Sequence, residues 1–377
     1  MQVLVVNAGS SSLRLRVLGP TDEAVAAANV RLEGNDTPAP EIESFVAEVA
    51  GVDAVGHRVV HGGPDLRRAT VVDDAVLERI EAQAPLAPLH QARAVAGIRA
   101  LRAVWPDIPA VACFDTAFHA TLPAAAATYA LPRQWRESWG LTRYGFHGLS
   151  HAYAVRRAAE VVGRELDGLR VVSCHLGAGS SLCATIGGRS VDTTMGFTPL
   201  EGLVMATRSG SVDPGLVLWL LRRAGLSADE VAEGLERASG LAGLAGGTGD
   251  VRHVVAAAAE DDTAALALGV YLHRLRREVA AMAAATNGVD VLVFTGGVGE
   301  HQPVVRAAAA EGLAFLGVHV NRRRNEAATG DADISANGAD TRTVVVTARE
   351  DLEIARQVRS TLADPRPADR PEVHRAG

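Results

Sequence analysis

The 377-residue sequence contains no lysine, so all 37 of its basic residues are arginines. This absence excludes a Walker A phosphate loop, because the lysine of that loop reaches the terminal phosphates of the nucleotide. It also excludes enzymes that form a Schiff base, because their nucleophile is a lysine amine. Arginine is therefore the only permanently charged cationic side chain that a phosphate site in this chain can use.

Several other features are scarce. The three cysteines form no CxxC pattern and fit no disulfide framework. The chain lacks an uninterrupted apolar run of about 18 residues, and its N-terminus lacks the basic and apolar regions of a signal peptide. A net charge of −7 provides no basic surface for nucleic acid. These absences predict a cytoplasmic protein that binds neither nucleic acid nor a membrane.

The residues that are present suggest a globular α/β protein. Hydrophobic residues make up 48% of the chain and charged residues 21%, which is enough apolar material for a large core. At about 150 residues per domain, the length suggests two domains. Short apolar runs alternate with stretches of helical periodicity. The expected strands cover residues 52–60, 108–114 and 289–294, and the expected helices cover residues 73–82, 151–162 and 263–286.

Two glycine- and serine-rich turns lie in matching surroundings. The apolar run 3–6 stops at residues 7–12, and alternating apolar residues follow as in a half-buried strand. The run 171–174 leads in the same way into residues 175–181 and then into a second strand. The tetrapeptide Ala-Gly-Ser-Ser occurs in both turns. The pattern predicts an internal duplication of a half-chain unit.

A third turn of this kind, Thr295–Gly299, follows the apolar run 289–294. Backbone N–H groups in such turns form anion-binding concavities, and glycine lets phosphate oxygens approach the backbone. None of the three turns has the GxGxxG spacing of a dinucleotide fold. A plain hairpin would explain any one turn alone, but three turns at strand ends favour a phosphate or nucleotide site.

Charged residues beside small residues are further candidates. Arg58 precedes a Gly-Gly turn, and Arg208 lies in Thr-Arg-Ser-Gly, so either guanidinium could hold a carboxylate or phosphate at two points. A surface arginine at a strand end is the alternative. Asp115 directly follows an apolar strand, where it could bind Mg²⁺ or cap a helix.

Histidine and glutamate patterns are less specific. His147 and His151 are four residues apart, but Gly148 stands where a zinc protease of the HExxH type needs glutamate. Glu350 opens an amphipathic C-terminal helix, where a carboxylate stabilises the helix dipole or binds a metal ion.

Taken together, these segments resemble the acetate kinase family of short-chain acyl kinases. The resemblance runs from Asn7 to about Arg356 and rests on separate motifs in order. They are NAGSSS at 7–12, GHRVVHGG at 56–63, LAPLH at 86–90, FDTAFH at 114–119, RYGFHGLSH at 143–151, GFTPLEGL at 196–203, TRSG at 207–210 and FTGGVGE at 294–300.

The resemblance implies the actin-like ATPase fold, with two duplicated ribonuclease-H-like domains and a nucleotide cleft between them. We expect residues 1–119 and 352–363 to form the first domain and residues 120–351 the second, which carries most of the nucleotide site. Residues 364–377 are expected to be a disordered tail. The helix after Glu350 is expected to pack on the first domain, and the resemblance also implies a homodimer.

The implied reaction is reversible, Mg²⁺-dependent transfer of a phosphoryl group from ATP to acetate, giving ADP and acetyl phosphate. Asp115, His147 and Arg208 would be catalytic, and Asn7 and Glu350 would form the Mg²⁺ site. Arg58 would hold the acetate carboxylate, and the methyl group would be enclosed by Val60, Leu89, Phe146 and Pro199. The nucleotide would contact Ser12, Arg14, His175, Leu176, Gly177, Ala178, Gly179, Asp250, Val251, Arg252, Gly297, Val298, Gly299, Glu300 and His301.

The sequence departs from the family pattern at a few positions. Arg14 stands where the family has lysine, and Ala178, His301 and Arg349 stand where it has asparagine. Residues 91–92 are Gln-Ala in place of Asn-Pro. A propionate or butyrate kinase of the same family is the close alternative, decided by the volume of the methyl pocket. An actin-like nucleotide-binding protein without acyl transfer is the alternative from another class.

Overall fold

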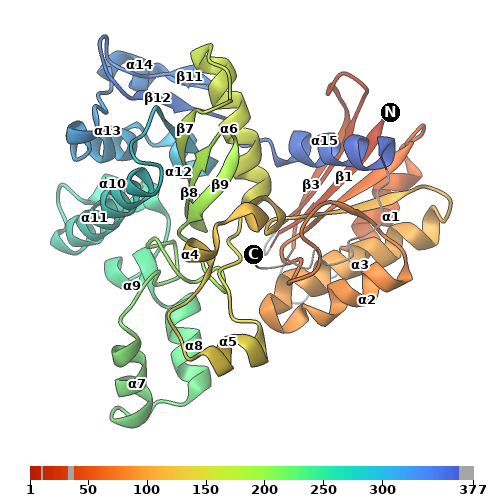
Figure 1. The fold of residues 1–377 in the computed structure, drawn as a ribbon, viewed down its shortest axis with the longest axis horizontal. Helices are drawn as coiled ribbons and strands as arrows, with labels where there is room; N and C mark the ends of the chain where they lie inside the picture. Colours follow the sequence, from red (N-terminus) through yellow and green to blue (C-terminus); the bar gives the residue numbers. More distant parts are fainter. Residues whose placement is uncertain (10–11, 33–37, 365–377) are drawn as a thin grey trace, which may run out of the picture. The chain divides into compact units, whose positions relative to one another are not determined.

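The computed structural model describes residues 1–9, 12–32 and 38–364 (Figure 1). The chain folds into two compact units. The first consists of Met1–Ala120, Phe146–Tyr153 and the chain from Arg349, and the second of Thr121–Gly145 and Ala154–Ala348. The domain limits expected at 119/120 and 351/352 remain a prediction. The expected tail, beyond Asp364, lies outside the described residues.

The first unit contains a six-stranded sheet in the order β3-β2-β1-β4-β6-β5. Strand β1 pairs in parallel with β4, and β4 pairs in parallel with β6, so these three strands end at the same edge. The remaining pairs are antiparallel. The strands are β1 Val3–Ala8, β2 Ser12–Leu18, β3 Ala24–Arg31, β4 Ala54–Val59, β5 Thr70–Val71 and β6 Ala110–Phe114.

The second unit repeats this topology. Its sheet has the order β11-β12-β10-β7-β8-β9, which matches the first sheet strand for strand when read from the other end. Both units open with an antiparallel meander and then add parallel strands. The predicted duplication and α/β fold are therefore confirmed. The strands are β7 Arg170–Leu176, β8 Ser180–Ile186, β9 Arg189–Thr193, β10 Val291–Thr295, β11 Ala332–Asp333 and β12 Arg342–Val345.

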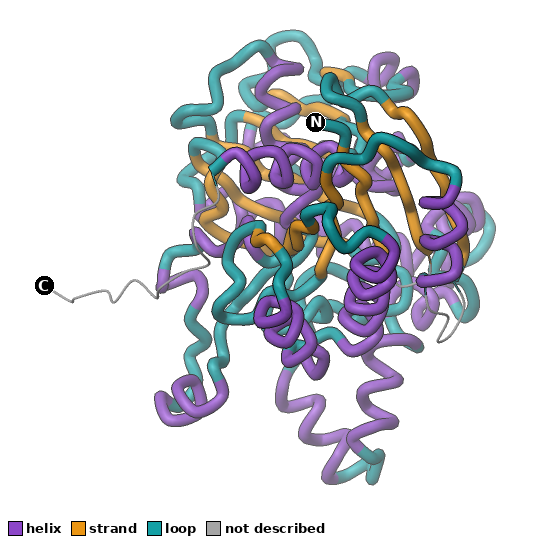
Figure 2. Tube along the Cα trace, turned by 90° about the vertical axis from the view of Figure 1, so that its right-hand side faces the viewer, coloured by secondary structure: helices purple, strands orange, loops and turns teal. Residues whose placement is uncertain are grey.

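Helices cover both faces of the first sheet, and the tube in Figure 2 shows its strands lying between them. Alternating side chains divide between two cores, with Leu4 and Val6 on one face and Val3 and Val5 on the other. The first core packs against α1 Ala39–Ala47, α2 Asp74–Ala82 and α3 Pro88–Val104. The second packs against α15 Glu350–Ala363, as expected for the C-terminal helix.

The core of the second unit lies between its sheet and a long helix, α11. Asp261 caps this helix by accepting a hydrogen bond from the Thr263 N–H at 2.8 Å. Tyr271, Leu275 and Val279 then recur on one buried face. The helices are α4 Ala124–Ala127, α5 Arg133–Trp139, α6 Gly148–Val162, α7 Pro214–Arg222, α8 Ala228–Arg237, α9 Gly240–Ala245, α10 Val251–Ala257, α11 Asp262–Ala285, α12 Gly296–His301, α13 Pro303–Glu311 and α14 Arg322–Ala327.

The helices and strands expected from the sequence are confirmed to within a few residues. The largest shift is in α6, which begins at Gly148 rather than at His151. Short 3₁₀ turns lie at Ala84–Leu86, Ala117–Thr121 and Ala314–Leu316. Within the described ranges, no helix is both long enough and apolar enough to cross a membrane.

Helix α15 approaches the first sheet at Gly56 of β4. A Cβ atom at this position would lie 2.5 Å from Ile354 Cγ2 and 2.8 Å from Val358 Cγ2. Both distances are too short for non-bonded carbon atoms. The absence of a side chain at residue 56 therefore lets the helix pack directly on the strand.

We predict that Gly56→Ala lowers the free energy of unfolding by about 1–3 kcal/mol, because the new methyl group displaces α15 from the sheet. The matched control is Gly234→Ala in α8, where nothing lies within 4 Å of the added Cβ. That change should be neutral or stabilising, because alanine favours helix over glycine by about 1 kcal/mol. Chemical denaturation of both variants tests this, and equal stability of the two would contradict the packing argument.

Candidate active site

Three polar side chains lie on one face of the first sheet, where its parallel strands end. Asn7 is near the end of β1, Arg58 is near the end of β4 and Asp115 directly follows β6. On each strand, every second side chain faces α15, and these three residues are the next in that series. The preceding residues on that face are Val5, Gly56 and Cys113. Alternation therefore directs all three side chains to the α15 face.

These side chains form a hydrogen-bonded cluster with Glu350, in the first turn of α15. The Arg58 guanidinium donates to both oxygens of Asp115, from Nε to Oδ1 at 3.1 Å and from Nη2 to Oδ2 at 2.6 Å. Its Nη1 donates to Asn7 Oδ1 at 3.1 Å. Asn7 Nδ2 then donates to Glu350 Oε2 at 2.7 Å. The structure thus brings together four residues that the sequence suggested separately.

Burial sets the electrostatics of this cluster. Asp115 is only 1% exposed. Its burial raises the pKa of the Asp115 carboxyl, and the Arg58 charge opposes that rise. Burial lowers the pKa of Arg58, but the charges of Asp115 and Glu350 outweigh this effect and raise it overall. The cluster therefore sets one guanidinium against two carboxyl groups.

Arg58 retains hydrogen-bonding capacity. Its guanidinium has five N–H groups, and the bonds to Asp115 and Asn7 leave one on each terminal nitrogen. Those two N–H groups have no hydrogen-bond partner in the described part of the chain, although Nη1 also lies 3.9 Å from Glu350 Oε2. They match the fork that binds a carboxylate at two points.

His147 is held beside Asp115 by the backbone. Gly148 N donates to the Asp115 carbonyl at 2.9 Å, and a Cβ atom on Gly148 would lie 2.1 Å from that oxygen. His147 itself has a φ of 56°, which is unusual for a residue with a side chain and costs about 1–2 kcal/mol. Such strain is often found at functional sites, where the surrounding structure maintains it.

The expected methyl pocket is only partly described. Val60 and Phe146 are both buried in the first unit. The Phe146 ring meets the His61 ring edge-on, with centroids 5.5 Å apart. The Leu89 side chain lies outside the described part of the structure. Pro199 belongs to the second unit.

Glycines bring the expected nucleotide segments of the second unit together. Gly296 has a φ of 77°, and a Cβ atom there would lie 2.7 Å from the Leu176 carbonyl oxygen. A Cβ atom on Gly249 would lie 2.3 Å from the Ala206 carbonyl oxygen. Ala206 N in turn donates to the Ala178 carbonyl at 3.1 Å. The turn after β7, the segment before Arg208, the start of α10 and α12 therefore meet through backbone contacts.

Two of the expected polar residues in this unit have defined partners. Arg208 Nη1 donates to the Pro199 carbonyl at 2.6 Å, and its other N–H groups have no hydrogen-bond partner within the described ranges. Burial lowers the pKa of Arg208. Asp250 caps α10 through the Arg252 N–H at 2.9 Å and also accepts from the Arg252 side chain. These hydrogen bonds lower the pKa of Asp250 to about 2.

Ser12 and Arg14 lie on β2 of the first unit. Arg14 is directly opposite Asn7 in the antiparallel pair, so the two side chains share a face of the sheet. Ser12 and Arg14 line an open hollow of about 640 Å³ together with Arg16 and Arg31. Three of the six residues that line this hollow are therefore arginines.

Two contributors were not identified from the sequence. Gln91 is fully buried, and its amide bonds the backbone of His61 on both sides, accepting from N at 3.3 Å and donating to O at 2.9 Å. It fixes the turn that follows Val60. Asp351 accepts from Arg16 and Arg349 and so anchors the start of α15 beside Glu350. The unusual residues at positions 91 and 349 were the only signals of these roles.

Comparison with known proteins places this chain in a family. Residues 34–356 match the family model described as the Acetokinase family. The chain is 39% identical to an acetate kinase of Shouchella clausii, over 94% of this chain and 98% of that protein. The crystal structure of the Porphyromonas gingivalis acetate kinase superposes with a TM-score of 0.88 at 34% identity, covering 96% and 99% of the two chains. A propionate kinase from Francisella tularensis gives a TM-score of 0.87 at 33% identity, covering 95% and 99%.

We predict that Arg58→Gln lowers the free energy of unfolding by about 3–5 kcal/mol at neutral pH, because it leaves Asp115 buried without its partner. The pKa of Asp115 should then rise further above the unfolded value of about 3.9. A raised carboxyl pKa means that the folded state holds the proton more tightly than the unfolded state. The deficit should therefore be smallest in acid and grow as the pH rises through the folded pKa.

Denaturation of wild type and variant from about pH 4 to about pH 8 measures this deficit. The control is the double variant Arg58→Gln, Asp115→Asn, whose own free energy of unfolding carries no contribution from the ionisation of residue 115. A deficit in the single variant that stays constant across this range would contradict the assigned electrostatics.

Proposed function

The chain belongs to the acetokinase family, and from this premise we propose that it transfers the γ-phosphoryl group of ATP reversibly to acetate, giving acetyl phosphate and ADP. The single observation that carries the proposal is the Arg58 guanidinium at the parallel strand ends. It binds Asp115 and Asn7 and, within the described residues, keeps one N–H without a hydrogen bond on each terminal nitrogen. A small carboxylate fits these two N–H groups.

The reaction needs positioning and charge neutralisation more than proton transfer. Acetate is already ionised at neutral pH, so no general base has to activate it. Asp115 therefore acts as an organiser, because both of its oxygens are bound to Arg58. His147 and Arg208 stabilise the charge on the phosphoryl group as it passes between the two oxygens. The unbonded N–H groups of Arg208 suit it to this role.

The acidic cluster also fits a magnesium ion. Its donors are the carboxylates of Glu350 and Asp115 and the amide oxygen of Asn7, all of which are hard oxygen ligands. In the described ranges, no group of three or more His, Cys, Asp and Glu side chains could hold a metal ion unaided. Magnesium typically uses one or two carboxylates and completes its shell with phosphate oxygens and water. When bound, it would neutralise charge on the phosphates.

We assign the nucleotide to the glycine-containing segments of the second unit, where the main chain is accessible. Glycines at 177, 179, 297 and 299 leave room for phosphate and sugar groups to approach the main chain. Ala178 offers only its backbone, and its carbonyl is already bonded to Ala206 N. His175 to Gly179, Asp250 to Arg252 and Gly297 to His301 therefore act mainly through main-chain groups.

We assign the selection between short-chain acids of different length to four apolar residues. Val60 and Phe146 are buried in the first unit, and the resemblance to acyl kinases assigns Leu89 and Pro199 to the same role. The likeness to a propionate kinase makes propionate the second candidate substrate. A pocket of this kind separates substrates that differ by one methylene by about 10- to 200-fold. We also propose that the protein acts in the cytoplasm and forms a homodimer.

The direct test is ADP formation from ATP and Mg²⁺ with formate, acetate, propionate and butyrate in turn. We expect acetate to give the highest kcat/KM, with propionate lower by about 10- to 200-fold. A maximum at propionate would identify the second candidate. ATP binding without any carboxylate-dependent ADP formation would instead indicate a nucleotide-binding protein that lacks acyl transfer.

We predict that Arg208→Ala lowers kcat by about 10³-fold or more, because a single arginine at a transferring phosphoryl group commonly has an effect of this size. Circular dichroism and thermal unfolding should match the wild type. The control is Arg133→Ala on α5, whose side chain is 82% exposed and pairs with Glu137 on the same helix. Turnover near the wild-type rate in Arg208→Ala would refute the role assigned to this residue.

A further inference from the structure

Arg306 is the largest fully buried side chain in the described part of the chain, with only 1% of its surface exposed. It lies on α13, one turn after the helix begins. A buried cation is costly unless its charge and donors are satisfied. Within the described ranges, the Arg306 guanidinium makes no bond to a carboxylate. Its partners are instead backbone carbonyls and an asparagine, and they account for a buried cation at this position.

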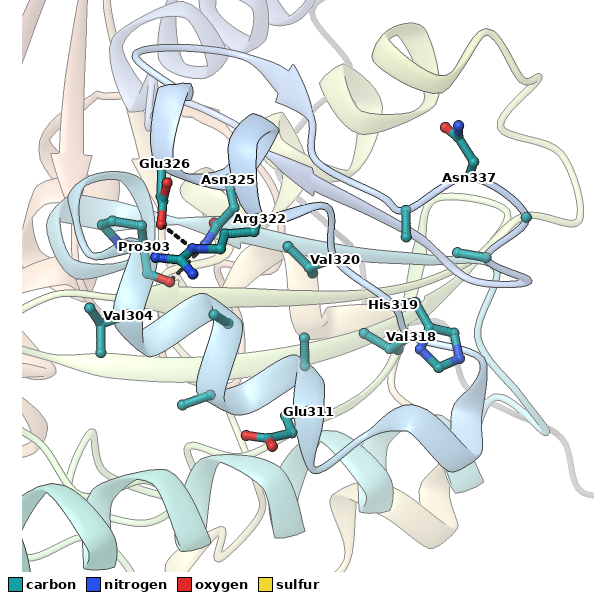
Figure 3. Close-up of a pocket in the computed structure, with 16 residues that line it drawn as sticks. Pro303, Val304, Glu311, Val318, His319, Val320, Arg322, Asn325, Glu326 and Asn337 are labelled. Carbon is teal, nitrogen blue, oxygen red and sulfur yellow. Dashed lines mark hydrogen bonds and ion pairs between the residues drawn. The ribbon is translucent and has the colours of Figure 1, made fainter.

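The guanidinium joins the end of α12 to α14. Nη1 donates to the carbonyls of Gly299 at 2.9 Å and Glu300 at 2.7 Å. On the other side, Nε donates to Asn325 Oδ1 and Nη2 to the Asn325 carbonyl, both at 2.7 Å. Asn325 Nδ2 then donates to the Pro303 carbonyl at 2.8 Å, a bond drawn in Figure 3 at one end of an open groove.

A cation suits this place. The last carbonyls of a helix have no partner within the helix and carry a partial negative charge. Helix α12 ends at His301, and α13 begins two residues later at Pro303, which has no N–H group to offer them. The Arg306 side chain supplies the missing donors. Burial lowers its pKa to about 10, so it is still charged at neutral pH.

Helix α12 is thereby held from two directions. Arg306 fixes its backbone at Gly299 and Glu300, and the Glu300 side chain accepts the Ala348 N–H at 3.0 Å through Oε1. Its first residue, Gly296, packs against Leu176 at the end of β7. A short helix without such anchors would have no fixed direction, since a few residues of helix are unstable alone.

We propose that Arg306 is a positioning residue for the nucleotide, which sets the orientation of α12 so that Gly297 to His301 can receive ATP. The inference rests on the proposed function, because that assignment places the nucleotide on this segment. Arg306 does not touch the nucleotide in this account and acts through the backbone of α12. Its loss should weaken ATP binding and leave acetate binding unaffected.

Arg276 provides a matched comparison. It lies on α11 and donates through Nε and Nη2 to the Ala308 carbonyl of the same helix, α13. It therefore ties α13 to its neighbour without touching α12. A variant without Arg276 therefore loses an arginine–carbonyl contact to α13 but keeps the contacts between Arg306 and α12.

The experiment measures the Kd for ATP, the KM values for ATP and acetate, kcat and thermal stability in wild type, Arg306→Met, Arg306→Lys and Arg276→Met. We expect Arg306→Met to raise the Kd and KM for ATP by about tenfold or more, as for the misplacement of a binding element by an ångström. The KM for acetate should stay within about twofold of wild type. Arg306→Lys should recover part of the loss, and Arg276→Met should change stability but not the KM for ATP.

Asn325→Ala keeps the test decisive if Arg306→Met does not fold. It retains the guanidinium but removes its side-chain anchor, and a selective rise in the Kd for ATP is expected. A folded Arg306 or Asn325 variant with an unchanged Kd for ATP overturns the inference, as does an equal rise in both KM values. If the wild type binds ATP but forms no ADP with acetate, the proposed function fails, and the Kd comparison still decides the role of Arg306.

Discussion

The polar cluster of the first unit depends on one group, the Arg58 guanidinium. Asp115 and Glu350 are both largely buried, and without a cation between them two carboxylates would face each other away from water. Arg58 relieves this by bonding both Asp115 oxygens and, through Asn7, reaching Glu350. The same bonds tie β1, β4, the end of β6 and the start of α15 together. The contacts that hold these elements together are therefore the same contacts that form the candidate site.

The duplication gives both units the same strand order but different residues at the strand ends. Both sheets have the same strand order, so both units present the ends of parallel strands in the same way. In the first unit those ends carry charged and amide side chains. In the second they carry glycine, with Asn7 before the first Ala-Gly-Ser-Ser turn and Gly177 before the second. Side chains suit a compact ion or carboxylate, whereas open backbone suits the larger surface of a nucleotide.

The sequence was sufficient to predict the duplicated α/β fold, because strand alternation and glycine-rich turns are local signals. It was also sufficient to pick out Arg58 and Asp115 one at a time, since each stands at the end of an apolar run. Their pairing was not predictable, because it needs β4 and β6 to be parallel neighbours in a register that sets Arg58 opposite Cys113. Arg306 and Asn325 gave no signal, since no pattern links residues on two short helices.

The absence of lysine has structural meaning only where the arginine is buried and bonds in several directions. Arg58 reaches both Asp115 oxygens and Asn7 at once, and Arg306 reaches two carbonyls of α12 and two oxygens of Asn325. A planar guanidinium with five donors can do this, whereas an ammonium group has three donors around a single atom. Arg14, by contrast, is exposed and lines an open hollow. The composition alone cannot distinguish the buried arginines from the exposed one, because the difference lies in the groups that surround each guanidinium.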